Sequence, residues 1–585
     1  MLPVIALGLS TLLPASLSAL RGPTPQESAP QDSAPPEGPV WRSIEEATVE
    51  GRAWSELAAP FDRLPARAEG VVRPPVWMLQ RASAGVCARF VTNAKEIRVR
   101  WTLTSEQLAM PHMPATGVSG VDLYGRDETG QWRWVGTGRP GWPRSESRIA
   151  AGLDGKAREY LLYMPLYNGV SSVEVGLPAE ARFAEGPARP ADRAKPVVFY
   201  GTSITQGACA SRPGMVHAAI LGRRLDRPVV NLGFSGNGRM DLELAPMIAE
   251  IDAALYVIDC LPNMSAEQVT ERAAPFVRAL RAQRPDTPIL LVEDRTFTNA
   301  PFKRSHVEAH ARRRAALRDA MEALRTEGVE RIAYLTGDGL LGLDGEAAVD
   351  ASHPTDLGFE RQADAFEPVV RELLGQPRPL RVLLLGDSIS LGYTADVRRR
   401  LAGRAIVVRA NRGPHDRRHE NCAGTTKGVA QLDRWLAQDG GRWDVIHFNF
   451  GLHDLKRIDA TTGKNSNDPS DPRQAEPDRY RANLDDIARR LKATGATVIF
   501  ATTTPVPEGD LRPHRDPADA LLYNAIAREV MAEHGVLVND LFEVIASGPA
   551  SLGKPANVHF TREGSAALGA QAAASILEAA GSARR

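Results

Sequence analysis

The chain has 585 residues, of which 43% are apolar and 24% are charged, a balance typical of globular proteins. One hydrophobic core rarely serves more than about 300 residues, so the length predicts about three domains. The 71 basic residues are balanced by 71 acidic ones. This balance excludes the strong basic field of a nucleic-acid-binding protein and favours a neutral partner.

The first 22 residues are mostly apolar, but they are too few and too often interrupted by proline to span a bilayer. Residues 23–39 are rich in Pro, Ser and Gln. We interpret residues 1–22 as a signal peptide and residues 23–39 as a disordered linker, which predicts export to the periplasm or the cell exterior. The lack of basic residues at the start leaves a misassigned start codon open. No later run approaches transmembrane length, so no stable membrane insertion is expected.

Residues 40–190 consist of short runs in which apolar and polar residues alternate, separated by Gly, Pro and Asn. This pattern is typical of an all-β sandwich or jelly roll. The clearest runs are residues 85–91, 97–103, 121–124, 160–163 and 173–175. Seven of the nine tryptophans also lie here. They can form a platform for sugar rings, although packing in the sheets is the favoured interpretation.

From residue 195 the pattern changes to apolar strands that alternate with helical segments, which predicts α/β domains with parallel sheets. A segment containing two prolines, residues 375–379, then interrupts the chain, and the same order of elements begins again. We therefore expect one α/β domain at residues 195–376 and a duplicated one at residues 379–580.

The first α/β domain places a serine directly after a buried strand, in Gly201-Thr-Ser203. Ligand sites of open α/β sheets lie at this carboxyl edge. A serine hydroxyl needs a base to become a nucleophile, and Asp350-Ala-Ser-His353 near the end of the domain offers an imidazole with a carboxylate to orient it. We expect Ser203, His353 and Asp350 to act together in acyl transfer.

Acyl transfer also needs hydrogen-bond donors for the oxyanion that develops on the substrate. The segment Ser235-Gly236-Asn237 follows the second strand and offers the backbone N–H of Gly236. The segment Leu261-Pro-Asn263 follows the third strand and offers a side-chain amide. We expect Gly236 and Asn263 to form the oxyanion hole.

These four segments, in this order, resemble the conserved blocks of the SGNH (GDSL-like) hydrolases. The resemblance implies a flavodoxin-like three-layer α/β/α fold, a serine nucleophile, an Asp-His pair and an oxyanion hole built from Gly and Asn. Two positions depart from the family pattern: Thr202 replaces the usual Asp, and Asn263 lies in Leu-Pro-Asn-Met. The β-rich region resembles the jelly-roll module that precedes some of these hydrolases.

The second α/β domain resembles the family more closely at its first block, Gly386-Asp-Ser388, which makes Ser388 the candidate nucleophile. Gly424, or its neighbour Ala423, is the candidate oxyanion donor. His453 stands where the family has Asn, and we expect it to add a pH dependence.

The base of this second domain is predicted to be His559, but Ala556 stands where the triad acid is expected. Asp540 is the nearest substitute in the sequence. A site without its orienting acid is slow, since that loss lowers the rate by up to about 10⁴. A catalytically inactive domain that only binds ligand is the alternative.

The cysteines do not form a metal-binding pattern, because no C-x-x-C spacing occurs. Cys209 and Cys260 each follow a site motif, so they either form a disulfide or remain two buried thiols. His306 and His310 are four residues apart but lack a third ligand, which favours a solvated helix face over a zinc site. No metal or organic cofactor is expected.

Together these features predict a secreted serine esterase that hydrolyses carboxylic esters, with acetyl groups on carbohydrate as the preferred class. The substrate is then a small-molecule or polysaccharide ester. The alternatives are a lysophospholipase or thioesterase of the same fold, and a carbohydrate-binding protein with a degenerate site. The lack of a lid-like apolar helix argues against a long-chain lipase.

Overall fold

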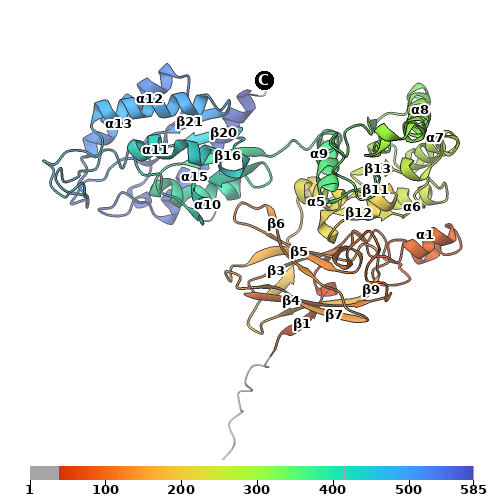
Figure 1. Ribbon diagram of the computed structural model, residues 1–585. Coiled ribbons are helices and arrows are strands. Elements are labelled where there is room, and N and C mark those ends of the chain that lie inside the picture. Colours follow the sequence, from red (N-terminus) through yellow and green to blue (C-terminus); the bar gives the residue numbers. More distant parts are fainter. Residues whose placement is uncertain (1–37, 414–415, 584–585) are drawn as a thin grey trace, which may run out of the picture.

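The computed structural model describes residues 38–413 and 416–583. The predicted signal peptide and nearly all of the predicted linker therefore lie outside the described residues. Figure 1 shows three parts: a β-sandwich (residues 40–185), a first α/β domain (residues 197–373, domain 1) and a second α/β domain (residues 380–583, domain 2). In the described part of the chain, no helix combines the length and apolar character needed to cross a membrane.

The β-sandwich consists of two antiparallel sheets, as the alternating sequence pattern predicts. One sheet has the strand order β1-β9-β4-β7, and the other has the order β10-β3-β8-β5-β6, with β2 paired to β3. The strands are β1 (Val40–Ser43), β2 (Thr48–Glu50), β3 (Cys87–Thr92), β4 (Glu96–Leu103), β5 (Val121–Arg126), β6 (Trp132–Gly138), β7 (Arg144–Ala151), β8 (Arg158–Tyr163), β9 (Val170–Leu177) and β10 (Phe183–Glu185). Strand β4 shows how the core forms: every second residue is buried, and Trp101 lies between the sheets with 1% of its surface exposed.

Domain 1 contains a parallel sheet in the order β12-β11-β13-β14-β15. Its strands are β11 (Val197–Gly201), β12 (Val229–Gly233), β13 (Leu255–Asp259), β14 (Ile289–Val292) and β15 (Ile332–Leu335). The chain places its second strand on one side of the first and its third on the other, which is the flavodoxin-like order. The predicted fold class is therefore correct.

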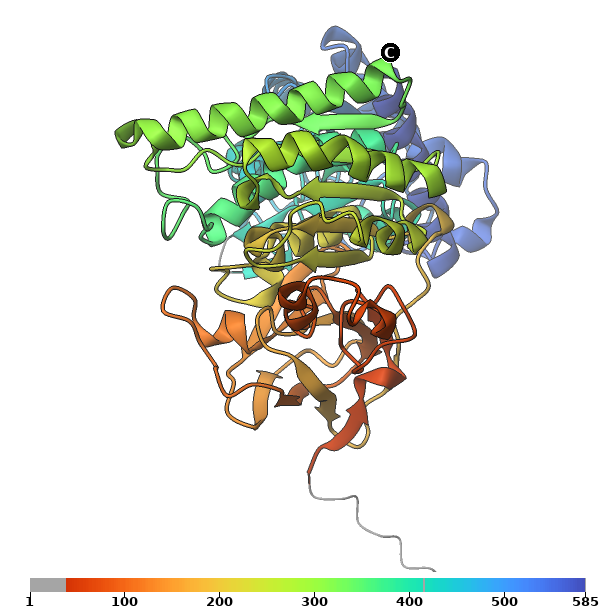
Figure 2. The same cartoon turned by 90° about the vertical axis from the view of Figure 1, so that its right-hand side faces the viewer.

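Helices cover both faces of this sheet. On one face lie α5 (His217–Leu225) and α9 (Asp356–Leu373), and on the other lie α6 (Leu244–Glu250), α7 (Ala266–Gln283) and α8 (Arg304–Thr326). Figure 2 shows the long helices α7 and α8 side by side, on the side of the domain away from the β-sandwich. Residues of the sandwich complete the core on the α5 and α9 face.

Domain 2 repeats the architecture with the strand order β17-β16-β20-β21-β22. Its sheet strands are β16 (Leu380–Leu385), β17 (Ala405–Arg409), β20 (Val445–Phe448), β21 (Thr497–Ala501) and β22 (Leu537–Asn539). Its helices include α10 (Ser388–Arg400), α11 (Thr425–Leu436), α12 (Pro477–Lys492), α13 (Pro517–Glu533), α14 (Leu541–Ala546) and α15 (Arg562–Ala583). A short antiparallel pair, β18 (Asn411–Gly413) and β19 (Asp416–His419), extends from it. Domain 2 contacts the preceding part through Arg193, which donates to the backbone oxygen of Gly403 at 3.3 Å.

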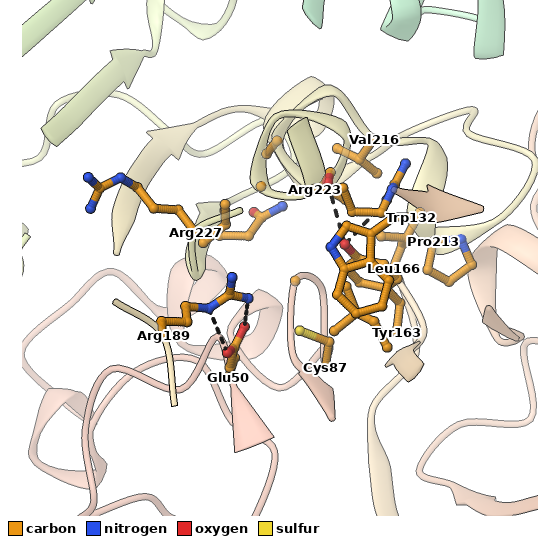
Figure 3. Close-up of a pocket in the computed structure, with 17 residues that line it drawn as sticks. Glu50, Cys87, Trp132, Tyr163, Leu166, Arg189, Pro213, Val216, Arg223 and Arg227 are labelled. Atoms are coloured by element: carbon orange, nitrogen blue, oxygen red, sulfur yellow. Dashed lines mark hydrogen bonds and ion pairs between the residues drawn. The ribbon is translucent and has the colours of Figure 1, made fainter. Parts of the chain in front are cut away.

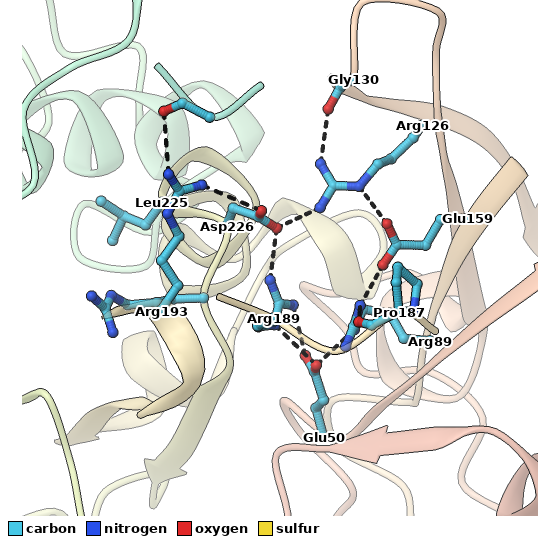
Figure 4. Close-up of polar contacts among 12 residues, drawn as sticks. Glu50, Arg89, Arg126, Gly130, Glu159, Pro187, Arg189, Arg193, Leu225 and Asp226 are labelled. Atoms are coloured by element: carbon cyan, nitrogen blue, oxygen red, sulfur yellow. Dashed lines mark hydrogen bonds and ion pairs between the residues drawn. The ribbon is translucent and has the colours of Figure 1, made fainter. Parts of the chain in front are cut away.

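A closed ring of alternating charges joins the β-sandwich to domain 1 (Figure 4). Its members, in order around the ring, are Glu50, Arg89, Glu159, Arg126, Asp226 and Arg189. The first four belong to the sandwich, Asp226 caps α5 of domain 1, and Arg189 lies in the connecting segment. Removing one partner of a buried ion pair destabilises a protein by about 3–5 kcal/mol. The ring therefore fixes how the sandwich sits on domain 1.

A cavity lies beside this ring at the same interface (Figure 3). Glu50, Cys87, Tyr163 and Arg223 are among its lining residues, and Arg223 donates to the hydroxyl of Tyr163 at 3.2 Å. Its volume of about 20 Å³ leaves room for about one water molecule. The cavity is a packing gap between modules, because it is too small for an ester substrate and no predicted site residue lines it.

The core of domain 1 contains a histidine that is held neutral. His217 on α5 is fully buried and stacks on Phe359, with ring centroids 5.8 Å apart and planes 4° apart. Neither ring nitrogen has a hydrogen-bond partner among the described residues. Burial, and to a lesser extent the charge of Arg295, lowers the pKa of His217 from its ordinary 6.5 to about 3.

This histidine is expected to make domain 1 acid-sensitive. As the pH falls from 6.5 towards 3, the unfolded chain binds a proton at His217 that the folded chain does not bind, so stability is lost in that window. At pH 5 the loss is about 2 kcal/mol. We expect His217→Leu to reduce the fall in Tm between pH 7.5 and pH 5 by about 4 °C or more, measured by calorimetry. His112→Gln, at an exposed histidine, is the control, and an equal fall in His217→Leu and wild type would contradict the prediction.

Candidate active sites

The parallel register of domain 1 brings three strand ends to one edge of the sheet. Gly201, the last residue of β11, is paired with Gly233 of β12 and with Asp259 of β13. The segments that begin two residues further on therefore lie at the same level. These segments carry Ser203, the Ser235-Gly236 pair and the short helix that ends at Asn263.

Ser203 is the first residue of the short helix α4 (Ser203–Gln206). Thr202 caps this helix by accepting a hydrogen bond from the N–H of Ile204. This explains how the domain tolerates Thr202 in place of the family's Asp, since either side chain can cap a helix. Tyr167 of the sandwich donates to the backbone oxygen of Ser203 at 3.2 Å, so the first module also helps to hold the serine.

The structure brings Ser203, His353 and Asp350 together. Ser203 Oγ lies 2.9 Å from His353 Nε2, and His353 Nδ1 lies 2.7 Å from Asp350 Oδ2. A carboxylate only accepts, so Nδ1 carries a proton and Nε2 offers its lone pair to the serine. This arrangement can take a proton from Ser203 as its oxygen attacks an acyl carbon.

A tight turn holds the acid against the histidine. The backbone N–H groups of Ser352 and His353 donate to Asp350 Oδ1 at 3.2 and 2.8 Å. Ala351 between them has a φ of 72°, a left-handed conformation that lets the carboxylate fold back. Partial burial raises the pKa of Asp350, but the hydrogen bonds from His353 outweigh it, so the pKa lies below its ordinary value and the group is ionised.

The two expected oxyanion donors lie at the same sheet edge. The amide nitrogen of Asn263 is buried without a hydrogen-bond partner among the described residues, although buried donors are nearly always paired. A side chain added at Gly236 would meet nothing within 4 Å, so space is open in front of this residue. The unpaired amide of Asn263 is a donor that an oxyanion bound at this edge can use.

We expect Asn263→Ala to lower the kcat of domain 1 by about 10²–10³, because one oxyanion donor is lost in the transition state. KM should change little, since the ground-state carbonyl oxygen carries less charge. The measurement is p-nitrophenyl acetate hydrolysis in a Ser388→Ala background, which silences domain 2. Asn299→Ala, at an amide of the same domain outside the site, is the control, and an unchanged kcat in Asn263→Ala would remove Asn263 from the oxyanion hole.

Domain 2 brings a second serine and histidine together. Ser388, the first residue of α10, has its Oγ 2.9 Å from His559 Nε2. The third member is Asn557, whose Oδ1 lies 2.7 Å from His559 Nδ1. The same oxygen accepts the backbone N–H of His559 at 2.9 Å. The second site therefore has a Ser-His-Asn arrangement, in which a neutral amide orients the base.

The expectation that Asp540 replaces the missing acid is wrong. Its carboxylate caps α14, accepts from Thr502 at 2.9 Å and pairs with Arg528. The sequence aligns Ala556 with Asp350, but the turn in domain 2 is shifted by one residue, so the partner of the histidine is two positions before it. The shift explains why a search for an acid at the aligned position misses Asn557.

His453 is partly buried, and its pKa is lowered to about 4 by burial and by the charges of Lys456 and Arg515, with smaller effects from Lys427 and His559. The ring is therefore neutral throughout pH 6 to pH 9. Within this range His453 does not change its charge, so it does not add the pH dependence that the sequence predicts. A neutral imidazole N–H can still donate to an oxyanion.

The backbone N–H of Ala423 already donates to Asn421 Oδ1 at 2.9 Å, which leaves Gly424 as the candidate donor of the second domain. The backbone supports the comparison with domain 1. Cys422 donates to Gly386, as Phe234 donates to Gly201, both at 3.0 Å. Gly424 thus corresponds to Gly236.

We expect Asn557→Asp to raise the kcat of domain 2 at least about tenfold, because a carboxylate stabilises the imidazolium that forms during attack, an effect that can reach about 10⁴. Asn557→Ala should lower kcat, since the ring then loses its orienting acceptor. Both variants are assayed in a Ser203→Ala background. Asn467→Asp, at an exposed amide of the same domain, is the matched control, and equal rates for Asn557→Ala and its parent would show that Asn557 does not orient His559.

The structure adds a further residue that the sequence does not connect with the site. His112 of the β-sandwich has its ring centroid 5.8 Å from that of His353. No local motif marks His112, because the contact depends on how the sandwich is placed on domain 1. The four cysteines of the chain, all in its described part, are free and buried, so Cys209 and Cys260 do not form a disulfide.

Comparison with known proteins agrees with this geometry. The GDSL-like lipase/acylhydrolase family matches twice, by one model at residues 194–371 and by another at residues 384–567. Residues 40–183 match the N-terminal module of SGNH-hydrolase-type esterases. A search of the curated proteins found no match.

Several solved structures are similar. A GDSL-like lipase from Bacteroides ovatus is 34% identical, with 57% of this chain and 98% of that chain covered and a TM-score of 0.55. The salicylyl-acyltransferase SsfX3 of a tetracycline biosynthetic pathway is 18% identical, with 59% and 99% covered and a TM-score of 0.47. A family two carbohydrate esterase from Clostridium thermocellum is 15% identical, with 50% and 94% covered and a TM-score of 0.36.

The fold and the matches define the class of protein, an ester-hydrolysing enzyme with a GDSL-like core. The chain belongs to the SGNH (GDSL-like lipase/acylhydrolase) family and carries two such domains behind an N-terminal module of the same family of esterases. The resemblance inferred from the sequence motifs is therefore confirmed.

Proposed function

We propose that the protein is an exported esterase that removes small acyl groups, acetyl above all, from carbohydrate. Ser203 attacks the ester carbonyl, His353 takes its proton, and the acyl group stays on Ser203 until water releases it. Asp350 holds the imidazole, while Gly236 and Asn263 receive the oxyanion. The observation that carries the proposal is the 2.9 Å contact between Ser203 Oγ and His353 Nε2, supported by the adjacent carboxylate.

The exposure of the site supports a small acyl group on a larger polar molecule. The side chains of Asp350 and His353 are 43% and 24% exposed. A site whose catalytic groups reach the surface suits an ester displayed on a bulky chain, whereas a long acyl chain needs a deep apolar channel. The equal numbers of acidic and basic residues also fit a neutral carbohydrate.

In domain 2 we propose a second, slower esterase site of the same mechanism. Ser388 is its nucleophile and His559 its base, while Gly424 and His453 are its oxyanion donors. The proposal is supported by the Ser388–His559 contact of 2.9 Å. The slower rate follows from Asn557, which orients the base but brings no negative charge to the imidazolium. Export of the whole protein is proposed from the apolar composition of residues 1–22.

The test compares Ser203→Ala, Ser388→Ala and the double variant on p-nitrophenyl acetate. We expect Ser203→Ala to remove most of the activity and the double variant to lose more than about 10³ in kcat, because the nucleophiles are gone. A fluorophosphonate probe should label Ser203 and Ser388 in the wild type. Full activity in the double variant would overturn the esterase mechanism.

Substrate class is tested separately by ranking kcat/KM. Acetylated xylo-oligosaccharides should exceed p-nitrophenyl octanoate and palmitoyl lysophosphatidylcholine. A preference for the long acyl chains would replace the carbohydrate assignment with that of a lysophospholipase, while leaving the roles of Ser203 and His353 intact.

A further inference from the structure

Three potential metal ligands from three segments of the chain meet beside Ser203. Within residues 38–413 and 416–583, His112, Cys209 and His353 form the one group of this kind, with ligand atoms all within 4.8 Å of one another. His112 belongs to the β-sandwich, Cys209 follows α4, and His353 is the proposed base. The mechanism above makes no use of His112 or Cys209.

The three segments are fixed to one another rather than gathered on a loose surface. His112 lies in a tight turn closed by two backbone hydrogen bonds between Met110 and Met113, of 3.0 and 3.1 Å. Three residues after this turn, Thr116 donates to the backbone oxygen of Ser211 at 2.6 Å. Ser211 lies two residues after Cys209, so this contact joins the segment of His112 to the segment of Cys209.

Ser211 also connects the cysteine segment to the histidine segment. Its backbone N–H and its hydroxyl donate to the carboxylate of Asp356, at 2.9 and 2.5 Å. Asp356 lies three residues after His353, at the start of α9. Ser211 is therefore a common anchor for the segments that carry all three ligands.

One nitrogen of His353 is available to a metal. Nδ1 is occupied by Asp350 at 2.7 Å, so a metal must use Nε2. Nε2 is also the atom that faces Ser203 Oγ at 2.9 Å and accepts its proton in the proposed reaction. A metal at this cluster and a proton from Ser203 would therefore compete for one lone pair.

We propose that His112, Cys209 and His353 bind a Zn²⁺ ion that reversibly inhibits domain 1. Two imidazoles and one thiolate are ligands that Zn²⁺ prefers, and three protein ligands leave a fourth position for water. Bonds of about 2.1 Å to nitrogen and about 2.3 Å to sulfur require ligand atoms about 3.5 Å apart, so the side chains must close by about 1 Å. The thiol proton of Cys209 is released to solvent when the metal binds.

This proposal gives the β-sandwich a regulatory contact with the active site, because the sandwich supplies His112 and domain 1 supplies Cys209 and His353. The inhibitory consequence rests on the proposed function, but metal binding itself does not. Domain 2 provides an internal control, since no group of potential ligands surrounds His559 in the described chain.

Metal binding is tested with Co²⁺ on the Ser203→Ala, Ser388→Ala protein, which keeps all three ligands and has no nucleophile. We expect one Co²⁺ per chain and a near-ultraviolet thiolate-to-cobalt charge-transfer band. Cys209→Ala should abolish the band, and His112→Ala should weaken binding at least tenfold. A missing band, or a band that persists in Cys209→Ala, would overturn the site. His112 is exposed, so its variant tests the site even if Cys209→Ala does not fold.

Inhibition is tested on p-nitrophenyl acetate hydrolysis by the Ser388→Ala protein, treated with EDTA and then titrated with Zn²⁺. Each variant is compared with its own EDTA-treated rate. We expect inhibition that EDTA reverses, with an inhibition constant raised at least tenfold by His112→Ala and unchanged by the control His306→Ala. The Ser203→Ala protein, which reports on domain 2, should be insensitive to the same Zn²⁺ concentrations.

Equal inhibition of wild type and His112→Ala would refute the regulatory role. If the protein hydrolyses no ester but still binds Co²⁺ through Cys209, the proposed function is refuted and the metal site is retained. The two proposals therefore fail through different measurements.

Discussion

The parallel pairing of β11 with β12 on one side and β13 on the other is the constraint on which the site depends. It places the ends of three strands at one level, so Ser203, Gly236 and Asn263 lie at one edge of the sheet although about 60 residues separate the first from the last. His353 comes from the other end of the domain's sequence. It lies three residues before α9, which packs against the sheet. In domain 2, β16 pairs in parallel with β17 on one side and β20 on the other, in the same way.

The two sites differ in the group behind the histidine. Asp350 brings a negative charge as well as an acceptor, whereas Asn557 brings the acceptor alone. Both select the tautomer that leaves Nε2 free for the serine. Only the carboxylate also stabilises the imidazolium, so duplication has kept the geometry in both domains and the electrostatic contribution in one.

The sequence predicts the architecture and most of the site because these depend on local patterns. Alternation identifies the sandwich, buried strand runs identify the sheets, and Ser203, Asp350, His353, Ser388 and His559 each follow or precede a recognisable turn. Asn557 escapes prediction since a one-residue shift of the turn moves the acceptor to a position where an amide is not expected. His112 escapes it because its neighbour is set by contacts between modules, which no single stretch of sequence contains.

The cysteines illustrate a further limit. Cys209 and Cys260 both follow site motifs, but their surroundings differ. Cys209 lies close to His353, whereas the thiol of Cys260 lies 3.7 Å from the backbone oxygen of Tyr200. Proximity to the same sheet edge does not place two side chains on the same side of it. Spacing along the chain leaves a disulfide open beside two buried thiols, and the structure has both thiols free.

The ring of charges between the sandwich and domain 1 limits how these two modules can change independently during evolution. Each member has two neighbours of opposite sign, so losing one residue removes one of the two partners from each of its neighbours. A replacement on the sandwich side therefore changes the charge balance at domain 1 unless a second replacement compensates it. The two modules should travel through evolution as one unit, while domain 2, attached outside the ring, is free to be gained, lost or exchanged.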